Sequence, residues 1–227
     1  RHINGSWCGE DSDFDATEKY SWLTETDAWQ YTWYAPHAME ELISLYGGDT
    51  TFVKKVNTLF DDAHYNHGNE PDHQAAFMYA YTTGTVDGAW RTQQRTRTIL
   101  STEYQSNAGG LSGNEDAGQM SAWYVMTAMG LYQVCPGCGG DSEYVLTTPL
   151  FDHTELSVGP DTTFRIDAVK PTSDAIYIES AMLNGANYNC SFISHQTVIN
   201  GGELVYILST EPNPTWGNTG RSCLSGQ

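Results

Sequence analysis

Three stretches of the sequence place carboxylates and amides directly before apolar runs of helical length. In the first, GNEDAGQMSAWYVMTAMG (residues 113–130), the run follows Asn114, Glu115 and Asp116. Asn114 can cap a helix, and the two carboxylates would then lie in its first turn, where the helix dipole favours negative charge. The same dipole keeps a carboxylate ionised, which suits a general base or a cation ligand. The stretch therefore predicts either a helix start alone or a helix start that also carries a site.

The second stretch, YNHGNEPDHQ (residues 65–74), gathers His67, Asn69, Glu70, Asp72 and His73 at the start of another predicted helix. Helix capping, with the histidines on a polar surface, is one interpretation. A metal site is the other. Because Asn and Glu oxygens are hard ligands, the metal indicated is calcium and not zinc.

The third stretch, WLTETDAWQYTWYAPH (residues 22–37), surrounds Glu25 with the aromatic residues Trp22, Trp29, Tyr31 and Trp33. Aromatic surroundings raise the pKa of a carboxyl group and offer flat faces on which a sugar can stack. The alternative is an aromatic wedge in the core with an exposed glutamate beside it.

All three stretches have the same form, an acidic loop that leads into a helix. Helices arranged in a ring would bring such loops together on one face. Two carboxyl groups there, one protonated and one ionised, are what the cleavage of a glycosidic bond requires.

The elements that must position these loops are helical up to about residue 133 and β-rich after it. Helical spacing predicts four further segments: PHAMEELISLYGG (36–48, with Pro36 at the first helical position), DTTFVKKVNTLF (49–60), NEPDHQAAFMYAYTTG (69–84, with Pro71 at its start) and GAWRTQQRTRTILSTEY (88–104). A period of two predicts strands in TFRIDAVK (163–170), AIYIESAML (175–183) and ELVYILS (203–209). The pattern predicts an α+β chain, with helices first and a β-rich module after them.

Composition limits the possible partners. The 227 residues are 39% hydrophobic and carry a formal net charge of −18, from 28 acidic and 10 basic residues. Such a surface repels phosphate backbones and anionic lipids, so we expect neither a nucleic-acid nor a membrane partner, and a cation is plausible. No segment reaches the roughly 20 apolar residues of a membrane span. Because the chain begins at Arg1 and not with a signal peptide, we expect a processed or cut part of a longer protein.

The cysteines and two sequons favour an extracellular protein. Zinc is disfavoured because Cys135 and Cys138 have no second pair of the same kind, so we expect them to form a disulfide or part of one. The other cysteines are Cys8, Cys190 and Cys223, and the odd total implies a free thiol or a partner on another chain. The sequons are Asn4-Gly5-Ser6 and Asn189-Cys190-Ser191.

Taken in order, the motifs TETDAWQYTWYAPH, HGNEPDHQ, GNEDAGQMSAWYVMTAMGLYQVCPG, YVLTTPLF, YIESAMLNG and PNPTWG resemble the C-terminal part of glycoside hydrolase family 92. The resemblance runs from about Gly5 to about Gly217. Members are calcium-dependent, inverting, exo-acting α-mannosidases. The resemblance implies the C-terminal portion of an (α/α)6 helical barrel over residues 1–133 and a β-rich, sandwich-like module over residues 134–227. The rest of the barrel would come from a missing N-terminal part or from a second chain.

The resemblance also implies catalytic roles. Glu25 stands where the family has its general acid, and Asp116 is similar to the general base, with Glu115 the less favoured candidate. For inversion, the two carboxyl groups should lie roughly 6.5–9.5 Å apart with a water molecule between them.

Binding roles follow from the same resemblance. His67 would face the terminal mannose, Trp29 and Asn114 would contribute to sugar binding, and Asn69 and Glu70 would be ligands or near-ligands of Ca²⁺. The implied substrate is a glycan that ends in α-mannose.

Several positions depart from the family pattern. Thr26 and Asp27 follow the proposed acid where Gly and Asn are usual, Ala38 replaces an Asp, and Asn114 stands where some relatives carry a second Asp. These departures keep a second hypothesis open, a secreted glycoprotein that binds mannose or serves a structural role without cleaving the sugar.

Overall fold

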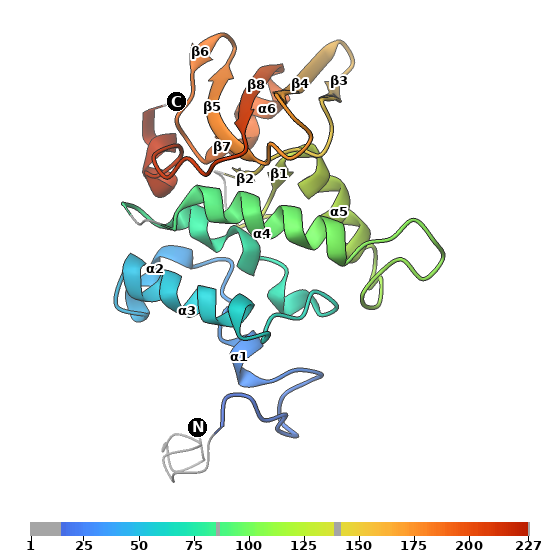
Figure 1. Cartoon of the computed structure of the whole chain (residues 1–227), viewed down its shortest axis with the longest axis vertical. Coiled ribbons are helices and arrows are strands. Elements are labelled where there is room, and N and C mark those ends of the chain that lie inside the picture. The colour runs from blue at the N-terminus through green and yellow to red at the C-terminus, as the bar shows by residue number, and fades with distance from the viewer. Residues whose placement is uncertain (1–14, 85–86, 139–141, 227) are drawn as a thin grey trace.

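The helical and the β-rich parts of the chain lie at opposite ends of the molecule (Figure 1). The structure is a computed structural model that describes residues 15–84, 87–138 and 142–226. The helices are α1 (Ala28–Tyr31), α2 (Met39–Leu45), α3 (Asp49–Asp61), α4 (Ala89–Thr102), α5 (Gln119–Met129) and α6 (His195–Ile199), with 3-10 helices η1 (Glu70–Asp72), η2 (Ala75–Tyr81) and η3 (Gly220–Gly226). The strands are β1 (Leu131–Tyr132), β2 (Glu143–Leu146), β3 (His153–Gly159), β4 (Thr162–Val169), β5 (Tyr177–Leu183), β6 (Ala186–Asn187), β7 (Phe192–Ser194) and β8 (Gly202–Ser209).

The strands form two sheets. One has the order β1-β2-β7 and is antiparallel throughout, and the other has the order β3-β4-β8-β5-β6, in which β4 and β8 are parallel. The three predicted strands are confirmed, because β4, β5 and β8 occupy those segments. Burial alternates along β4 and β8, whereas an irregularity between Ile178 and Ser180 interrupts the alternation in β5. The predicted α+β class, with helices first and strands after them, is therefore confirmed.

The helix predicted over residues 69–84 is wrong in type. The chain forms two short 3-10 helices there, η1 and η2, and every residue of η2 is buried. An all-apolar segment has no polar face from which a helical period can be read, so the surrounding core decides its winding. Pro36 is likewise not the first helical residue, since α2 begins at Met39.

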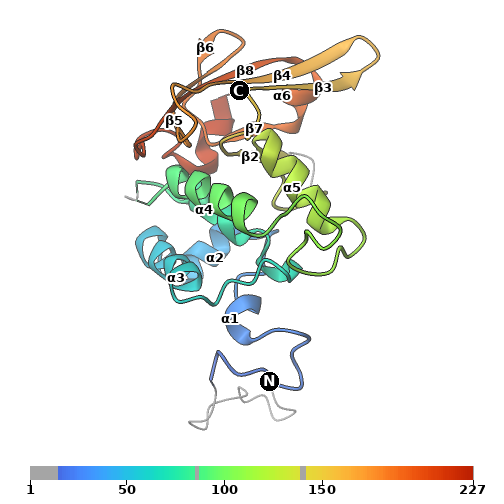
Figure 2. The ribbon, with the colours of Figure 1, turned by 45° about the vertical axis from the view of Figure 1, so that its right-hand side comes forward.

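One hydrophobic core joins the helical and β-rich parts. The Phe77 ring of η2 stacks on Tyr132 of β1 at 4.1 Å, and Tyr81 meets Phe192 of β7 edge to face at 4.9 Å. The layers follow one another in Figure 2, with the strands above α4 and α5, and α2, α3 and α1 below them. The first strand begins at Leu131, two residues before the predicted boundary, and the division into two modules stays a prediction.

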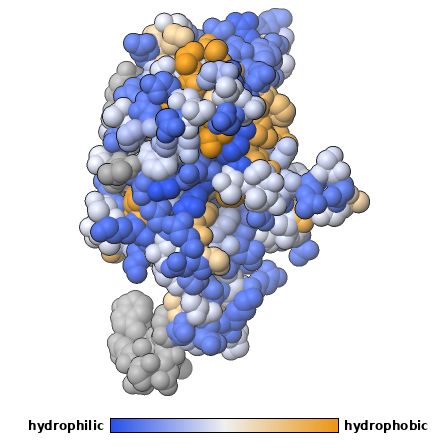
Figure 3. Space-filling model, in the orientation of Figure 1, coloured by the Kyte–Doolittle hydropathy of each residue, from blue (hydrophilic) through white to orange (hydrophobic). Residues whose placement is uncertain are grey.

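Two disulfides lie in the β-rich part. Cys135 is bonded to Cys138, which confirms that part of the prediction, and Cys190 is bonded to Cys223. Cys8 and the sequon at Asn4 lie outside the described residues. Within the described ranges, no helix combines the length and the apolar character that crossing a membrane requires. The face in Figure 3 is largely hydrophilic, with apolar patches mainly over the β-rich end.

Candidate active site

The loops that contain the second and first acidic stretches pack backbone against backbone. A Cβ atom on Gly68 would lie 2.7 Å from the carbonyl oxygen of Ser112, and one on Gly113 would overlap the backbone of Gly68. Neither glycine has a left-handed φ, so space and not backbone freedom requires glycine at both positions. This contact brings the HGNEP and GNED stretches together, as predicted for loops on one face.

The third stretch attaches to the same region through α1. Asp27 caps this helix by accepting a hydrogen bond from the backbone N–H of Gln30 at 3.0 Å. The Gln30 side chain donates to the carbonyl of His64 at 3.2 Å, and Trp29 stacks on the His64 ring at 5.0 Å. The chain around residues 64–74 therefore contacts α1, which begins three residues after Glu25, and the loop that carries Asp116.

Glu25 and Asp116 are exposed, and both have strained backbones. Their φ angles are 65° and 42°, in the left-handed region that side chains other than glycine rarely adopt. Ala117 follows with φ 57° and Gly118 with φ 89°. Left-handed residues of this kind cost of order 1–3 kcal/mol each and cluster at functional sites.

Glu115, and not Asn114, caps α5. Its carboxylate accepts hydrogen bonds from the backbone N–H of Ser121 at 3.0 Å and from the Ser121 hydroxyl at 2.7 Å, and both bonds lower the pKa of Glu115. The prediction that the helix starts after Asn114 is wrong, because three successive left-handed residues delay the start to Gln119. In the part of the chain that the structure covers, no hydrogen bond engages the Asp116 side chain.

His67 is the centre of a hydrogen-bonded chain. The Tyr104 hydroxyl donates to the carbonyl of Met120 at 3.0 Å, so it accepts from Nε2–H of His67 at 2.7 Å. Nδ1 of His67 is then the acceptor for the Tyr65 hydroxyl, also at 2.7 Å. The ring is 2% exposed, and burial lowers the pKa of His67 to about 3, with a further contribution from His73. A sugar hydroxyl could reach this ring only by replacing one of the two phenols.

His73 fixes η1 against α5. Its Nε2–H donates to the carbonyl of His67 at 3.0 Å, and Nδ1 accepts from the Gln119 amide at 3.3 Å. The Trp123 indole donates to the carbonyl of His73 at 3.0 Å. Burial lowers the pKa of His73, so the ring is neutral at neutral pH.

Buried carboxylate oxygens without partners mark the HGNEP loop. Glu70 Oε1 and Asp72 Oδ1 are both buried and unpaired, while Asp72 Oδ2 accepts from the backbone N–H of Asn66 at 2.8 Å. Burial raises the pKa of Asp72 to about 7. Asn69 is 8% exposed and makes no side-chain cap. Unpaired carboxylate oxygens fit a hard cation, and Asn69 and Glu70 are the residues that would hold one.

Carboxylates and imidazoles alone do not complete that site. Among the described residues, no group of three or more His, Cys, Asp and Glu side chains is placed to hold a metal ion. A calcium ion bound by Asn69 and Glu70 would therefore need further oxygens from amides, carbonyls, water or the sugar itself.

The family model for the catalytic domain of glycosyl hydrolase family 92 matches residues 1–210. The chain belongs to glycosyl hydrolase family 92. The resemblance seen in the motifs is thereby confirmed.

Known proteins resemble the chain in sequence, and solved family 92 structures also share its fold. The chain is 30% identical to an uncharacterized secreted glycosidase of Arthroderma benhamiae over 96% of its own length. It superposes on an inverting mannosidase of family 92 from Bacteroides thetaiotaomicron with a TM-score of 0.84, at 31% identity over 95% of the chain. A family 92 alpha-mannosidase of the same organism gives a TM-score of 0.85, at 28% identity over 96% of the chain. The chain spans only 28%, 31% and 29% of these three relatives, respectively.

The aromatic residues of the third stretch divide between core and surface in this family 92 chain. Trp33 is fully buried, as the core interpretation expected, whereas Trp22 is 59% exposed and stacks on Tyr20 at 5.1 Å. Trp29 is half-buried, with the Lys55 ammonium 5.6 Å from its ring centre. Thr26, one of the departures from the family pattern, is buried and hydrogen-bonded to the Gln30 side chain.

Sequence reasoning grouped Asp72 with the second acidic stretch but missed Gln119 and Tyr104. Gln119 lies within a quoted motif, where its polar character could have indicated a role. Tyr104 gave no signal, because it comes from the polar end of α4 and meets His67 only through the fold. It also lines a cavity of about 360 Å³ between α4 and α5, together with Leu100, Leu111 and Tyr124.

Proposed function

We propose that the protein containing this chain is an exo-acting, inverting α-mannosidase that removes terminal α-mannose from extracellular glycans. The observation that carries the proposal is the pair of exposed, strained carboxylates, Glu25 and Asp116. Asp116 lies on the loop that contacts Gly68, and Glu25 shortly precedes α1, which contacts His64. Membership of family 92 and the mannosidase relatives support it.

In the proposed reaction, Glu25 donates its proton to the glycosidic oxygen as the bond to the anomeric carbon breaks. Asp116 takes a proton from a water molecule that attacks this carbon on the opposite face, so the mannose leaves with inverted configuration. Since no hydrogen bond among the described residues competes for its side chain, Asp116 would be free to orient the water, while Glu115 remains engaged with Ser121.

The remaining predicted site residues have binding and positioning roles in this proposal. Asn114, exposed beside the base, and Trp29, half-buried beyond the acid, would contact the sugar. His67 would act through Tyr65 and Tyr104, which it links to each other. A calcium ion held by Asn69 and Glu70 would supply positive charge to sugar hydroxyls and help to distort the ring.

Localisation and partners complete the proposal. Two disulfides and a secreted relative support an extracellular protein. Because the chain spans less than a third of its relatives, we propose that parts outside it complete the sugar pocket.

The test is mannose release from an α-mannobiose by the full protein, with the product anomer followed by NMR. We expect β-mannose as the first product, lost on chelation of calcium and in the Glu25→Gln and Asp116→Asn variants. Release of α-mannose would contradict inversion. Calcium-dependent binding of mannose with no release would instead support the binding-protein hypothesis, which the departures at Thr26, Asp27 and Ala38 motivate.

A further inference from the structure

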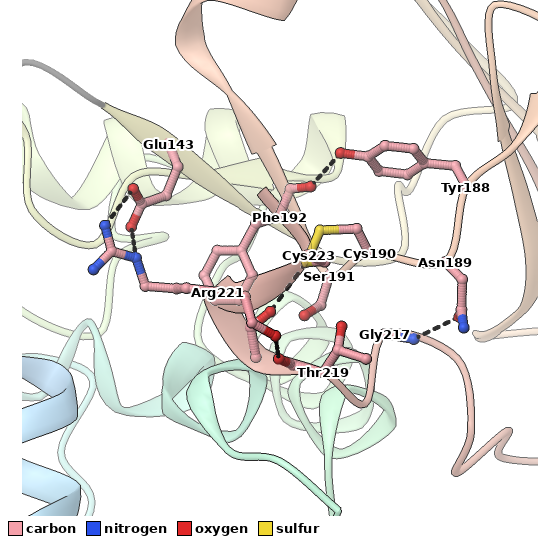
Figure 4. Close-up of a disulfide and its surroundings, with 12 residues drawn as sticks. Glu143, Tyr188, Asn189, Cys190, Ser191, Phe192, Gly217, Thr219, Arg221 and Cys223 are labelled. Atoms are coloured by element: carbon pink, nitrogen blue, oxygen red, sulfur yellow. Dashed lines mark hydrogen bonds and ion pairs between the residues drawn. A yellow bond between two sulfur atoms is a disulfide. The ribbon is translucent and has the colours of Figure 1, made fainter. Parts of the chain in front are cut away.

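The sequon Asn189-Cys190-Ser191 lies in the connection between β6 and β7, where a disulfide holds it (Figure 4). Its three side chains have different environments. Asn189 is exposed, Cys190 is 3% exposed and bonded to Cys223, and Ser191 is fully buried. Only the asparagine of the sequon is therefore presented at the surface.

The Asn189 amide is held by its oxygen and not by its nitrogen. Oδ1 accepts a hydrogen bond from the backbone N–H of Gly217 at 3.0 Å (Figure 4), and no described contact engages Nδ2. An N-linked glycan is attached at Nδ2 and leaves Oδ1 available as an acceptor. A glycan on Asn189 is therefore compatible with the folded structure. It would leave in place the hydrogen bond from Gly217, which is the only one that the Asn189 amide makes in the described part of the chain.

The serine hydroxyl, which defines the sequon, is inaccessible in the folded state. Its Oγ donates to the carbonyl of Ala80 at 3.4 Å, and its own carbonyl accepts from the backbone N–H of Leu146 at 2.8 Å. Gly217 covers it so closely that a Cβ there would lie 2.9 Å from the Cβ of Ser191. An enzyme that recognises Asn-X-Ser must therefore act before this region folds.

We propose that Asn189 carries an N-linked glycan, added before β7 pairs with β2 and before Cys190 bonds to Cys223. In this step, Nδ2 of Asn189 forms a bond to the anomeric carbon of an oligosaccharide carried on a lipid diphosphate. The lipid diphosphate leaves with the electron pair of the broken carbon–oxygen bond, and the amide nitrogen loses one proton. The inference rests on the proposed extracellular route of the protein.

Chain order favours this sequence of events. Cys223 follows Cys190 by 33 residues, so the sequon is synthesised well before its disulfide can close. The connection between β6 and β7 lies at the β-rich end, far from α1 in Figure 1, so a glycan there would stay away from the helix that follows Glu25 in the sequence.

The first test is secretion of the protein from a eukaryotic host in an Asn4→Gln background, which removes the other sequon. Peptide mass spectrometry, after enzymatic release of glycans in heavy-oxygen water, is expected to find labelled Asp at position 189. Asn189→Asp keeps the acceptor for Gly217, and Ser191→Ala keeps Asn189 itself, and both should abolish the modification. Asn213→Asp is the matched control, because Pro214 disqualifies that Asn-Pro-Thr triplet.

An unmodified Asn189 in the secreted, disulfide-bonded protein would overturn the proposal. Since a secretion signal delivers the chain in this assay, that result is independent of the natural localisation and of mannosidase activity.

The second test addresses timing. Unglycosylated protein is offered to an oligosaccharyltransferase and its lipid-linked donor, either folded and oxidised or reduced and unfolded. We expect modification of Asn189 only in the unfolded sample, and a reduced Cys223→Ser variant should behave in the same way. Equal modification of the folded, oxidised protein would overturn the proposed order.

Discussion

Two adjacent carboxylates, Glu115 and Asp116, have different tasks. Glu115 is tied to the first turn of α5 through both the N–H and the hydroxyl of Ser121. Asp116 follows it with a left-handed backbone, which turns the chain before the helix and leaves the carboxylate exposed. One residue therefore starts the helix while its neighbour stays available for chemistry.

This division predicts opposite effects for two isosteric variants of the full protein. Asp116→Asn should lower kcat by roughly 10²–10⁴-fold, as loss of a general base does, with little change in melting temperature. Glu115→Gln should lower the melting temperature and retain most of the activity, because the neutral amide accepts weaker hydrogen bonds from Ser121 than the carboxylate does. Kinetics on an α-mannoside and thermal unfolding measure both. Inactivity of Glu115→Gln beside an active Asp116→Asn would reverse the assignment of the base.

The buried histidines predict a loss of stability in acid. Burial lowers the pKa of both His67 and His73 below the ordinary value of 6.5. As pH falls below about 6.5, the unfolded chain takes up protons that the folded chain excludes, so the free energy of unfolding falls by up to about 1.4 kcal/mol per pH unit for each histidine. The hydrogen bond to the His67 carbonyl and nearby Glu70 oppose the shift of His73. Asp72, whose pKa burial raises to about 7, takes up a proton in the folded chain as pH falls and offsets part of the loss.

Urea unfolding between pH 7.5 and 5.5 measures this effect. We expect a shallower pH dependence in His73→Gln, and an unchanged one in His37→Gln, because His37 is exposed. Equal slopes in all three proteins would contradict the role assigned to His73.

At the scale of elements, contact between two loops organises the site. The loops around Gly68 and Gly113 approach so closely that neither tolerates a β-carbon. The bonds from His67 to Tyr65 and Tyr104 join the same loop to the end of α4. Together these contacts hold the HGNEP loop against the start of α5.

Gly68→Ala should therefore reduce both stability and activity. Forcing a methyl group into a filled space typically costs about 1–3 kcal/mol, and it would push the two loops apart. Gly109→Ala is the matched control, since a Cβ there would find its nearest neighbour at 3.7 Å. Denaturant unfolding and mannoside kinetics of both variants measure the difference. A fully active and stable Gly68→Ala protein would show that the backbone contact is not required.

For the whole molecule, charge is the dominant feature. A net charge of −18 makes the folded chain repel itself, and any added salt screens this repulsion. Under the proposed function, a cation would also bind specifically beside the unpaired oxygens of Glu70 and Asp72, which screening by salt does not do.

Calcium and potassium chloride at matched ionic strength should separate the two effects. Both salts should raise the melting temperature of the full protein, and calcium should raise it further. At a calcium concentration a hundred times the Kd, binding adds about 2.7 kcal/mol to the free energy of unfolding. Glu70→Gln should remove only the increment specific to calcium. Identical shifts with the two salts would argue against a calcium site at Asn69 and Glu70.

Local patterns in the sequence were sufficient for the class of fold and for its longer elements. Strands β4 and β8 and helices α3 and α4 could be read from the period of their apolar residues, because each has one face in the core and one in solvent. Strand β5 was indicated by its β-branched and aromatic residues. The family could be predicted as well, since its long motifs are continuous in sequence and the family match confirms them.

Only the tertiary structure decided how those motifs are used. The 3-10 winding of η2 and the bond between Cys190 and Cys223 depend on neighbours distant in sequence. The contact of His67 with Tyr104, 37 residues away, leaves no periodic trace in the chain. The period of the apolar residues indicates which face of a segment is buried, whereas the segment that packs against this face depends on the tertiary structure. The sequence alone therefore determined which residues are available for chemistry, and the fold determined which of them remain free to perform it.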